Sequence, residues 1–487
     1  MNPLCYIDFY KTGHQAQYPT GISRVWSNWT SRTSRLVERQ GTVHFGLQYF
    51  IKKYLLGDFQ HLFFDQRREN VISEYRDILT QTLGTCPNLD HIGRLWDHQR
   101  LPLDIYTVPE GRFAPCGVPA LVLVNTTPDT FWLPNYLETL LSNTLWQPST
   151  SATIATIYRE IFESAAREFG HTDLSFVDWQ GHDFSMRGLG SVEAASASGM
   201  GHLLSFKGTD TIPAILTAHQ YYHAALSCGG SVPATEHSVM CAGSLEGELE
   251  TIKRLITEVY PTGIVSIVSD TWDLWRVLTD YLPALKDTIL ARDGKIVIRP
   301  DSGDPVNIVC GDPAATNPSE CAGVLRLLRD TFGLDPSGML NKVGVIYGDS
   351  ITPDRARAIT SRCVRELGMS PYNCVFGIGS YTYQYQTRDT LGFAMKATAI
   401  EQHGRVVPIY KDPVTDTGGK RSHKGIPLAT HKYLGHDKFT LQCTTSITPA
   451  NLDECAFRKV FSDGQLLIDE NFDLVRQRVR ENIYETH

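Results

Sequence analysis

The residues best suited to chemistry are polar side chains that follow short apolar runs in the middle of the chain. RPDSGDP (299–305) places Arg299 and Asp301 directly after the apolar run IVI. Arg299 suits an anion or a carbonyl oxygen, and Asp301 suits a ribose diol or a hydrated Mg²⁺. A solvated loop rarely needs Arg and Asp so close to a strand end. This segment is the strongest local indication of a functional site.

Two glycine-containing segments carry residues that could contact a ligand, and each also has a structural interpretation. In GHDFSMRGLG (181–190), Phe184 could stack on a flat ring and Arg187 could pair with a phosphate, or they could be a core Phe and a surface Arg. In FKGTDT (206–211), Asp210 could accept a hydrogen bond from an amide N–H. An ordinary Asx-turn or helix cap is the commoner use of such an Asp.

Histidines occur in two suggestive contexts. Glu236 and His237 are adjacent in SVPATEHS, where the His could be a general base, a metal ligand or a phosphate-accepting nucleophile, although a lone His is more often structural. His219 and His223 have the i, i+4 spacing of a helical metal pair. No HExxH motif or nearby Cys accompanies them, so a half-buried helix face explains this pair better.

Phosphate-loop patterns are weak. FGIGS (376–380) is a short glycine-rich turn that could offer backbone N–H groups to a phosphate. No GxxxxGK[ST] motif occurs, and neither GMG nor GLG continues as GxGxxG. A P-loop or a Rossmann dinucleotide site is therefore unsupported.

The elements that must position these residues alternate between short buried strands and helices. Apolar runs at 264–268, 296–298, 343–346 and 374–376 are each followed by a polar loop, and helical patterns follow the first three. This rhythm predicts parallel βα units, whose working groups gather at the carboxyl ends of the strands. Six strand-end residues are therefore expected near one another: Asp270, Asp273, Arg299, Asp301, Asp349 and Gly379.

Composition limits the class of protein. The 487 residues are 42% hydrophobic, enough for a sizeable core, and 45 Lys+Arg against 53 Asp+Glu argue against a nucleic-acid or anionic-membrane partner. No apolar run could span a bilayer and no secretory signal is visible. The 11 scattered cysteines fit neither a zinc site nor a disulfide framework. A reduced, cytoplasmic, globular protein is expected.

The domain organisation is expected to be two-part. Residues 151–389 form the α/β unit that carries the site, and a helical stripe at 151–170 opens it. Residues 1–150 and 390–487 have shorter strands and turns. They are expected to form a second, β-rich α+β domain built from both ends of the chain.

Taken together, the segments resemble the nicotinamide phosphoribosyltransferases, a type II phosphoribosyltransferase family, over nearly the whole chain. The motifs that carry the resemblance occur in the family's order: YKTGHQAQYP, HFGLQY, YTVPEG, HDFSMRG, FKGTDT, SVPATEHS, SDTWD, IRPDSGDP, YGDS, FGIGS, TRDT and KDPV…KRS…KG.

The resemblance implies an irregular α/β barrel with a second β-rich domain, and a homodimer with shared active sites. It implies transfer of phosphoribosyl from phosphoribosyl pyrophosphate to nicotinamide in NAD salvage, with Mg²⁺ and optional coupling to ATP hydrolysis. Displacing pyrophosphate passes through a cationic sugar, so cations must neutralise the leaving group and no covalent nucleophile is needed.

Residue roles follow from the same resemblance. Phe184 would cover one face of nicotinamide, and Tyr10 of the neighbouring subunit would cover the other. Asp210 and Arg299 would hold the carboxamide. His237 would be phosphorylated by ATP. Glu236, Asp273 and Asp301 would place Mg²⁺, and Asp301 would also hold the ribose. The remaining substrate contacts would be Ser231, Gly348, Asp349, Gly379, Ser380 and Arg187, with pyrophosphate held by Arg32, Arg388, Lys396, Lys411 and Lys420.

The chain departs from the family pattern at its phosphate-binding segments. Ser380 and Tyr381 replace glycines, Gly344 stands where an Arg is usual, and the loop before Lys420 is one residue longer. Two other functions remain open. A nicotinate phosphoribosyltransferase on the same fold is disfavoured by Asp210, which would repel the ligand's acid group. A non-catalytic nucleotide-binding protein is disfavoured by the intact site residues.

Overall fold

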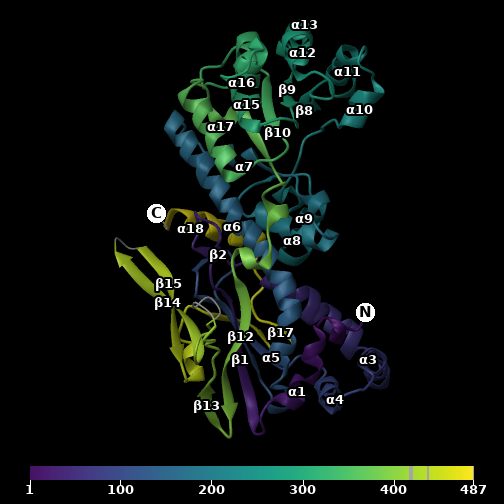
Figure 1. Ribbon diagram of the computed structural model, residues 1–487, viewed down its shortest axis with the longest axis vertical. Helices are drawn as coiled ribbons and strands as arrows, with labels where there is room; N and C mark the ends of the chain where they lie inside the picture. Colours follow the sequence, from purple (N-terminus) through teal and green to yellow (C-terminus); the bar gives the residue numbers. More distant parts are fainter. Residues whose placement is uncertain (416–420, 436–437, 486–487) are drawn as a thin grey trace. The chain divides into compact units, whose positions relative to one another are not determined.

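The computed structural model describes residues 1–415, 421–435 and 438–485 (Figure 1). It divides into two compact units. Unit 1 is Met1–Thr153, Leu216–Ala225 and Gln386–His487, and unit 2 is Ile154–Ile215 and Leu226–Tyr385. The sequence places the boundaries at residues 150 and 390 and assigns the segment 216–225 to the barrel. The structure places that segment in unit 1.

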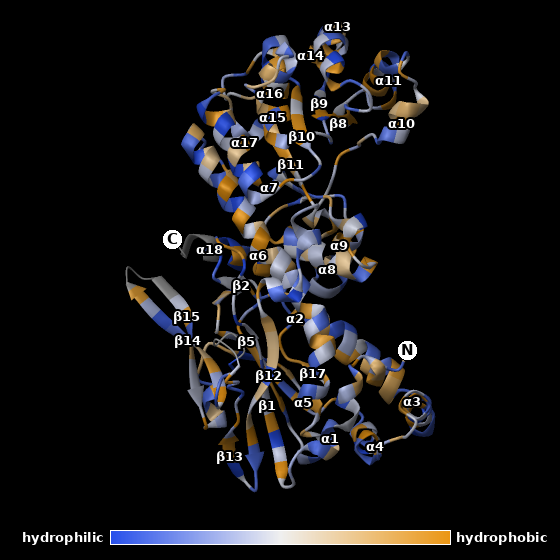
Figure 2. Ribbon diagram, viewed as in Figure 1, coloured by the Kyte–Doolittle hydropathy of each residue, from blue (hydrophilic) through white to orange (hydrophobic). Residues whose placement is uncertain are grey.

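Unit 2 is built on a six-stranded, all-parallel sheet in the order β7-β6-β11-β10-β9-β8. Its strands are β6 (Gly181–Asp183), β7 (Gly208–Thr209), β8 (Gly263–Val268), β9 (Gly294–Arg299), β10 (Val343–Tyr347) and β11 (Cys374–Ile378). The four strands expected from apolar runs are confirmed. β9 and β10 stand out as apolar in Figure 2, as expected for strands covered on both faces.

An extended segment fills the gap between the edge strands β7 and β8. The amide of Thr209 donates to the carbonyl of Gly230 (3.0 Å), and the amide of Thr235 donates to the carbonyl of Ser266 (3.0 Å). Isolated parallel bridges join the same segment to both strands. The sheet thereby curls into the irregular α/β barrel expected from the sequence, and SVPATEHS lies along its closing edge.

Helices connect the strands of unit 2. They are α7 (Val177–Gln180), α8 (Val192–Leu203), α10 (His237–Ala242), α11 (Glu248–Arg254), α12 (Leu274–Arg276), α13 (Leu282–Ala284), α14 (Lys286–Leu290), α15 (Pro305–Cys310), α16 (Pro318–Phe332) and α17 (Pro353–Arg365). α16 and α17 are the helices expected after β9 and β10. Side chains cap both of them: Asn317 accepts from the amide of Ser319, and Thr352 accepts from the amide of Arg355.

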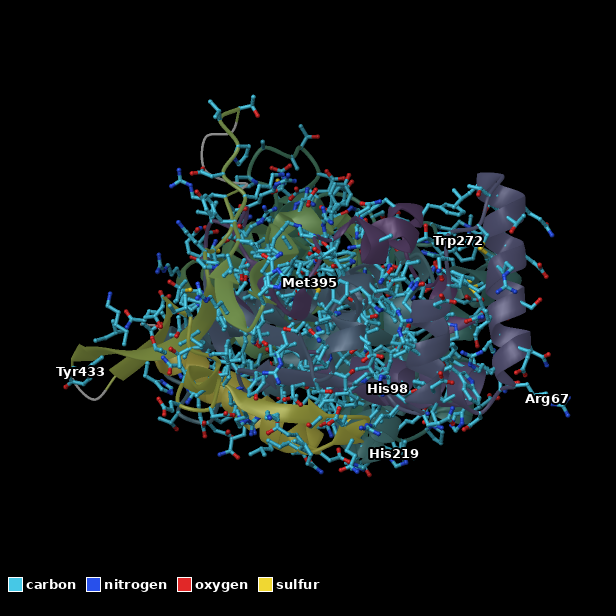
Figure 3. All side chains as sticks on the ribbon, turned by 90° about the horizontal axis from the view of Figure 1, so that it is seen from below. Arg67, His98, His219, Trp272, Met395 and Tyr433 are labelled. Atoms are coloured by element: carbon cyan, nitrogen blue, oxygen red, sulfur yellow. The ribbon has the colours of Figure 1, made fainter. Side chains whose placement is uncertain are left out.

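Unit 1 contains a seven-stranded antiparallel sheet in the order β13-β12-β1-β5-β3-β16-β17. Its strands are β1 (Ile22–Ser31), β3 (Leu103–Thr107), β5 (Pro119–Asn125), β12 (Phe393–Gln402), β13 (Arg405–Pro408), β16 (Arg458–Ser462) and β17 (Gln465–Leu466). β1 pairs with β12, so Trp29 lies opposite Met395 (labelled in Figure 3) and stacks on Phe393 at 5.0 Å. The two ends of the chain therefore share one sheet.

Two ribbons and several helices complete the fold. The ribbons are β2 (Gly41–Val43) with β4 (Phe113–Pro115) and β14 (Ile426–Gly435) with β15 (Lys438–Ser446); the helices are α1 (His14–Gln17), α2 (Leu47–Phe50), α3 (Arg68–Leu83), α4 (Asp90–Asp97), α5 (Leu133–Tyr136), α6 (Glu138–Phe169), α9 (Ile212–Tyr222) and α18 (Phe472–Glu485). The expected helical stripe lies in α6, where Ile154, Ile157 and Ile161 are buried. None of the described helices is long and apolar enough to cross a membrane.

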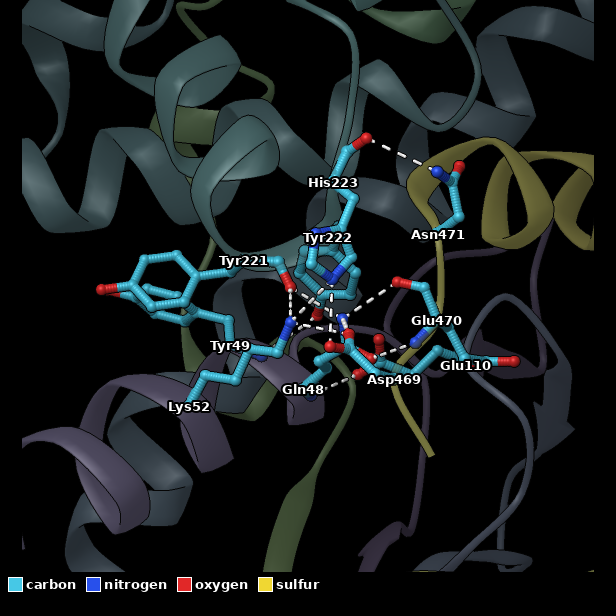
Figure 4. A network of polar contacts seen from close by, with 10 residues as sticks. All are labelled: Gln48, Tyr49, Lys52, Glu110, Tyr221, Tyr222, His223, Asp469, Glu470 and Asn471. Carbon is cyan, nitrogen blue, oxygen red and sulfur yellow. Dashed lines mark hydrogen bonds and ion pairs between the residues drawn. The ribbon is translucent and has the colours of Figure 1, made fainter. Parts of the chain in front are cut away.

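A polar network explains why residues 216–225 belong to unit 1 (Figure 4). Lys52 donates to Asp469 (2.6 Å) and to the carbonyl of Tyr221 (3.0 Å), and His223 lies 3.0 Å from the second oxygen of Asp469. Gln48 also donates to that carbonyl (2.7 Å). These bonds join segments far apart in sequence, so no local pattern indicates them.

The same network contains a buried carboxyl group, that of Glu110. One oxygen accepts from the amide of Gln48 (3.0 Å), and the other has no hydrogen-bond partner among the described residues. Burial raises the pKa of Glu110 to about 7, and the charge of Glu470 acts in the same direction. The folded protein therefore holds this proton more tightly than the unfolded chain does.

Glu110→Gln is expected to flatten the pH dependence of stability. Because the folded-state pKa is raised, the stabilising effect of the protonated carboxyl is complete below about pH 4.5. It is lost as pH rises from there through about 7, by up to about 3 kcal/mol in all. Urea unfolding at pH 5 and pH 8.5 measures most of this loss, which the Gln variant should lack. The exposed Glu258→Gln is the control. Equal pH slopes for Glu110→Gln and wild type would contradict the expectation.

Candidate active site

The working groups of unit 2 gather at the carboxyl ends of its parallel strands. A polar or aromatic residue lies at the end of each strand or within two residues after it, and parallel strands bring these residues to the same edge of the sheet. These residues are Phe184 after β6, Asp210 after β7, Asp270 after β8, Arg299 and Asp301 at the end of β9, Asp349 after β10 and Ser380 after β11.

Asp210 is held by two neighbours. One of its oxygens lies 2.9 Å from Nε2 of His182 and accepts a hydrogen bond from the hydroxyl of Ser231 at 2.6 Å. Burial alone would raise the pKa of Asp210. The bonds from His182 and Ser231, with the charge of Arg299, lower it below its ordinary value. Asp210 is therefore an ionised hydrogen-bond acceptor at neutral pH.

Phe184 provides an aromatic wall whose position depends on glycines. Its ring centroid lies 4.8 Å from that of His182. A Cβ at Gly377 would lie 2.5 Å from the Phe184 ring, and one at Gly348 would lie 2.2 Å from Oδ1 of Asp301. Both glycines therefore allow the ring and the carboxylate to approach the backbone more closely than any other residue would.

Arg299 and Asp301 lie side by side at the end of β9. Arg299 donates to the carbonyl of Thr235 (2.7 Å), and its Nε is 3.7 Å from Oδ2 of Asp301. Asp270 accepts from the amide of Asp301 (2.9 Å). Burial raises the pKa of Asp301 against the opposing charge of Arg299, and Asp270 and Asp349 raise it further. One oxygen each of Asp270 and Asp301 is buried without a hydrogen-bond partner among the described residues.

His237 begins the short helix α10 on the closing segment. Its Nδ1 lies 3.0 Å from the hydroxyl of Thr271, and its Nε2 lies 3.9 Å from Oδ1 of Asp270. Its neighbour Glu236 is exposed and contacts the hydroxyl of Ser238. His237 is half exposed and reachable from solvent.

The structure corrects the expectation for Asp273. One oxygen of Asp273 accepts from the amides of Trp275 (3.0 Å) and Arg276 (3.2 Å), so this residue is the N-cap of α12. The carboxylate that faces His237 and Asp301 belongs to Asp270. Both acids follow β8, and the start of α12 decides which of them turns into the site.

The phosphate-side residues form a smaller cluster. Asp349 accepts from Ser380 (3.0 Å) and from Ser350 (2.6 Å). A Cβ at Gly379 would lie 3.0 Å from the carbonyl of Phe184, which favours glycine there. Arg187 is exposed in the turn after Phe184. Ser380, which replaces a glycine of the family pattern, therefore orients Asp349.

The remaining expected contacts belong to unit 1. Arg32 and Lys396 line one cavity of about 460 Å³ together with Arg421. Arg388 pairs with Asp389 (3.2 Å), and Tyr10 is 60% exposed. The amide of Lys411 donates to Ser422 (2.9 Å). Lys420 lies outside the described residues.

The possible histidine metal pair has other partners. Nδ1 of His219 lies 2.7 Å from the carbonyl of Ala224, and His223 bonds Asp469. Figure 3 labels His219, which is exposed. Residue 223 follows the end of α9 with φ +55°, outside the helical geometry that i, i+4 ligands need. The half-buried helix face expected from the sequence is also wrong, because His219 is exposed and His223 lies beyond the end of α9.

Comparison with known proteins agrees with this geometry. Residues 179–464 match the nicotinate phosphoribosyltransferase (NAPRTase) family, and residues 2–81 match the nicotinamide phosphoribosyltransferase N-terminal domain. A nicotinamide phosphoribosyltransferase of Acinetobacter baylyi is 45% identical, covering 99% of this chain and 98% of the relative. One of Xanthomonas campestris is 32% identical, covering 98% and 97%.

The chain belongs to the nicotinamide phosphoribosyltransferase family. It is therefore a pentosyltransferase. Solved structures agree on the fold. Nicotinate-nucleotide pyrophosphorylase from Pyrococcus furiosus aligns with a TM-score of 0.58 at 13% identity, covering 99% of this chain and 96% of that one. Human nicotinic acid phosphoribosyltransferase aligns with a TM-score of 0.57 at 16% identity, covering 98% and 93%.

The sequence interpretation did not assign a role in this site to His182 or Asp270. His182 precedes Phe184 by two positions on β6, and the alternation of strand residues would have placed both on one face. Asp270 was expected only as a strand-end residue. The helix-cap pattern of Asp273 was the signal that separates the two acids.

Proposed function

We propose that this chain transfers the phosphoribosyl group of phosphoribosyl pyrophosphate to nicotinamide, giving nicotinamide mononucleotide and pyrophosphate in NAD salvage. The observation that carries the proposal is the ionised Asp210, fixed by His182 and Ser231. Such an acceptor suits the N–H of a carboxamide and repels a carboxylate. Phe184 would stack on the pyridine ring, and Arg299 would donate to the carboxamide oxygen.

In the proposed reaction the bond from the anomeric carbon to the pyrophosphate oxygen breaks, and the ring nitrogen forms the new bond. No proton transfer to the base is needed, because the ring nitrogen attacks through its lone pair. The chain's task is to position that weak nucleophile and to exclude water. Asp301 would hold the ribose hydroxyls, and Gly348, Asp349, Gly379 and Ser380 would line the ribose and 5′-phosphate site.

Mg²⁺ is proposed as the metal. Within the part of the chain that the structure describes, no cluster of three or more His, Cys, Asp or Glu side chains is arranged for a metal. Mg²⁺ often binds through one or two carboxylates and substrate phosphates. Oδ1 of Asp270 and Oδ1 of Asp301, which have no hydrogen-bond partner among the described residues, fit that mode. Bound there, Mg²⁺ would neutralise charge on the leaving pyrophosphate. Asp273 does not support this role, since it caps α12.

We also propose a homodimer with shared active sites. Phe9 and Tyr10 are 53% and 60% exposed, a patch suited to covering a ligand in a second copy. Pyrophosphate would be held by Arg32, Arg388, Lys396, Lys411 and Lys420.

A cytoplasmic location is supported by the eleven cysteines, all of which are unpaired.

The test is a competition assay. Purified enzyme receives phosphoribosyl pyrophosphate and Mg²⁺ with equimolar nicotinamide and nicotinate, and both mononucleotides are quantified. The proposal requires nicotinamide mononucleotide as the main product. A preference for nicotinate would establish the rival phosphoribosyltransferase. No release of pyrophosphate from phosphoribosyl pyrophosphate with either base would establish a non-catalytic binding protein.

ATP coupling is proposed to act through His237. Its half-exposed ring, with Nε2 facing Asp270, can accept a phosphoryl group from ATP. His237→Ala is expected to abolish acid-labile label from γ-³²P-ATP and any stimulation by ATP, while basal transfer stays within a few-fold. His219→Ala is the matched control. Label retained in His237→Ala would place the phosphorylation elsewhere.

A further inference from the structure

Glu138 joins three segments of unit 1 that are far apart in sequence. It is the first residue of α6, where the positive end of the helix dipole stabilises a carboxylate. One of its oxygens pairs with the ammonium of Lys11 in the N-terminal segment. The other oxygen lies 3.4 Å from the ammonium of Lys396 on β12. One carboxylate therefore bridges two cations.

The first of these cations, Lys11, fixes the segment that carries Tyr10. Lys11 is 3% exposed, so its desolvated ammonium depends on the charge of Glu138. The same ammonium lies 5.3 Å from the ring centroid of Tyr10, within cation–π range. The hydroxyl of Thr139 donates to Asp8 (2.7 Å), which is a second bond between α6 and this segment. The exposed Tyr10 ring therefore stands on a support that α6 provides.

The second cation, Lys396, faces an open cavity. Its side chain is 39% exposed and lines the cavity of about 460 Å³ that also contains Arg32 and Arg421. An ammonium has three N–H donors. Two acceptors for them occur among the described residues, Oε1 of Glu138 and the carbonyl of Met395 (2.7 Å). The third donor is available to an anion in the cavity.

Arg388 belongs to the same cluster. Burial raises the pKa of the Tyr10 hydroxyl, the charges of Glu138 and Asp8 raise it further, and the charge of Arg388 lowers it. Arg388 and Glu138 therefore both lie near the Tyr10 ring. The ring and the two cations that the family resemblance assigns to a neighbouring subunit's substrates are thus arranged around one carboxylate.

We propose that Glu138 is the positioning residue for the groups that unit 1 contributes to the active site of a second copy of the chain. It fixes Tyr10 through Lys11 and orients Lys396 toward pyrophosphate. The inference rests on the proposed homodimer with shared active sites. The two ammonium groups cover the carboxylate and leave one net positive charge, so Glu138 does not repel the pyrophosphate that Lys396 binds.

Glu138→Gln keeps the size of the side chain and removes its charge. Steady-state release of pyrophosphate is expected to show a KM for phosphoribosyl pyrophosphate raised about tenfold, with kcat within about threefold, because the lost interaction acts on binding. Glu69→Gln is the matched control, since Glu69 is an exposed acid in the first turn of α3 in the same unit.

A double variant separates positioning from stability. Glu138→Gln alone leaves the buried Lys11 without its counter-ion, whereas Lys11→Met with Glu138→Gln leaves neither charge of that pair. The double variant should recover the thermal midpoint of the wild type and retain the raised KM, because Lys396 still lacks its partner. Recovery of both the midpoint and KM would show a purely structural role and would overturn the proposal.

Mixed dimers test whether Glu138 acts on the second copy. Differently tagged subunits that carry Glu138→Gln and Asp301→Asn are purified together. The intact barrel of the Glu138→Gln subunit then receives unit 1 of the Asp301→Asn subunit, so the mixed dimer should have the KM of the wild type. A raised KM in the mixed dimer would place the action of Glu138 within its own subunit and would overturn the proposal.

Calorimetric titration with pyrophosphate provides a readout that needs no turnover. Glu138→Gln and the double variant should bind pyrophosphate about tenfold more weakly than the wild type. Unchanged pyrophosphate affinity in both variants would overturn the proposal, and so would a monomeric protein in sedimentation. An inactive wild type whose pyrophosphate affinity depends on Glu138 would instead refute the proposed transfer reaction and support this inference.

Discussion

Asp301→Asn is expected to lower kcat/KM for phosphoribosyl pyrophosphate by about a thousandfold, equivalent to about 4 kcal/mol of transition-state stabilisation. Asp301 has a buried oxygen without a partner, lies beside Arg299, and receives its backbone orientation from Asp270. Asn keeps the shape and loses the charge that would hold Mg²⁺ and a developing cationic sugar. Steady-state release of pyrophosphate measures the effect.

The neighbouring acids provide the controls. Asp270→Asn should lower kcat/KM by a comparable factor, because Oδ1 of Asp270 is also buried without a hydrogen-bond partner among the described residues and faces His237. Asp273→Asn should change kcat/KM by no more than a few-fold, since Asn caps a helix about as well as Asp. If Asp273→Asn lowered kcat/KM strongly and Asp270→Asn left it unchanged, the N-cap geometry would have pointed to the wrong catalytic acid.

The parallel βα units and the edge that carries the site could be predicted from local sequence, whereas the barrel was implied by the family resemblance. Short apolar runs followed by polar loops require parallel βα units, and parallel strands bring their carboxyl ends to one edge. Arg299, Asp301 and Asp349 therefore follow from spacing alone. The closing segment could not be predicted this way, because SVPATEHS has a Pro and no strand alternation. Its backbone pairs with β8 through Pro233 and Thr235, and the preceding Gly230 pairs with β7, only once those strands exist.

Long-range contacts account for most of what the sequence could not indicate. The end of α9 belongs to unit 1 because Lys52, Gln48 and Asp469 bind the backbone and side chains at residues 221–223. The pairing of His182 with Asp210 likewise joins neighbouring strands whose register is a tertiary property. Residue type alone does not distinguish such a supporting histidine from a structural one.

Base selectivity gives the second large expected effect. Asp210→Asn is expected to shift the ratio of kcat/KM for nicotinamide over nicotinate by about a hundredfold toward nicotinate, or about 3 kcal/mol. The ionised carboxylate accepts from the carboxamide N–H and repels the nicotinate carboxylate, whereas the Asn amide can donate to that carboxylate. Separate kinetics with each base, at saturating phosphoribosyl pyrophosphate, measure the ratio.

Asp304→Asn is the matched control, because Asp304 caps α15 in the same unit and is similarly exposed. The pH dependence of the nicotinamide-over-nicotinate ratio is a second test. With the pKa of Asp210 held below its ordinary value, its carboxylate stays ionised from pH 6 to 8.5, and so does nicotinate. The wild-type ratio should therefore be flat over that range. A ratio unchanged by Asp210→Asn would assign the discrimination to Arg299 or to the shape of the cavity, since no other carboxylate among the described residues lines it.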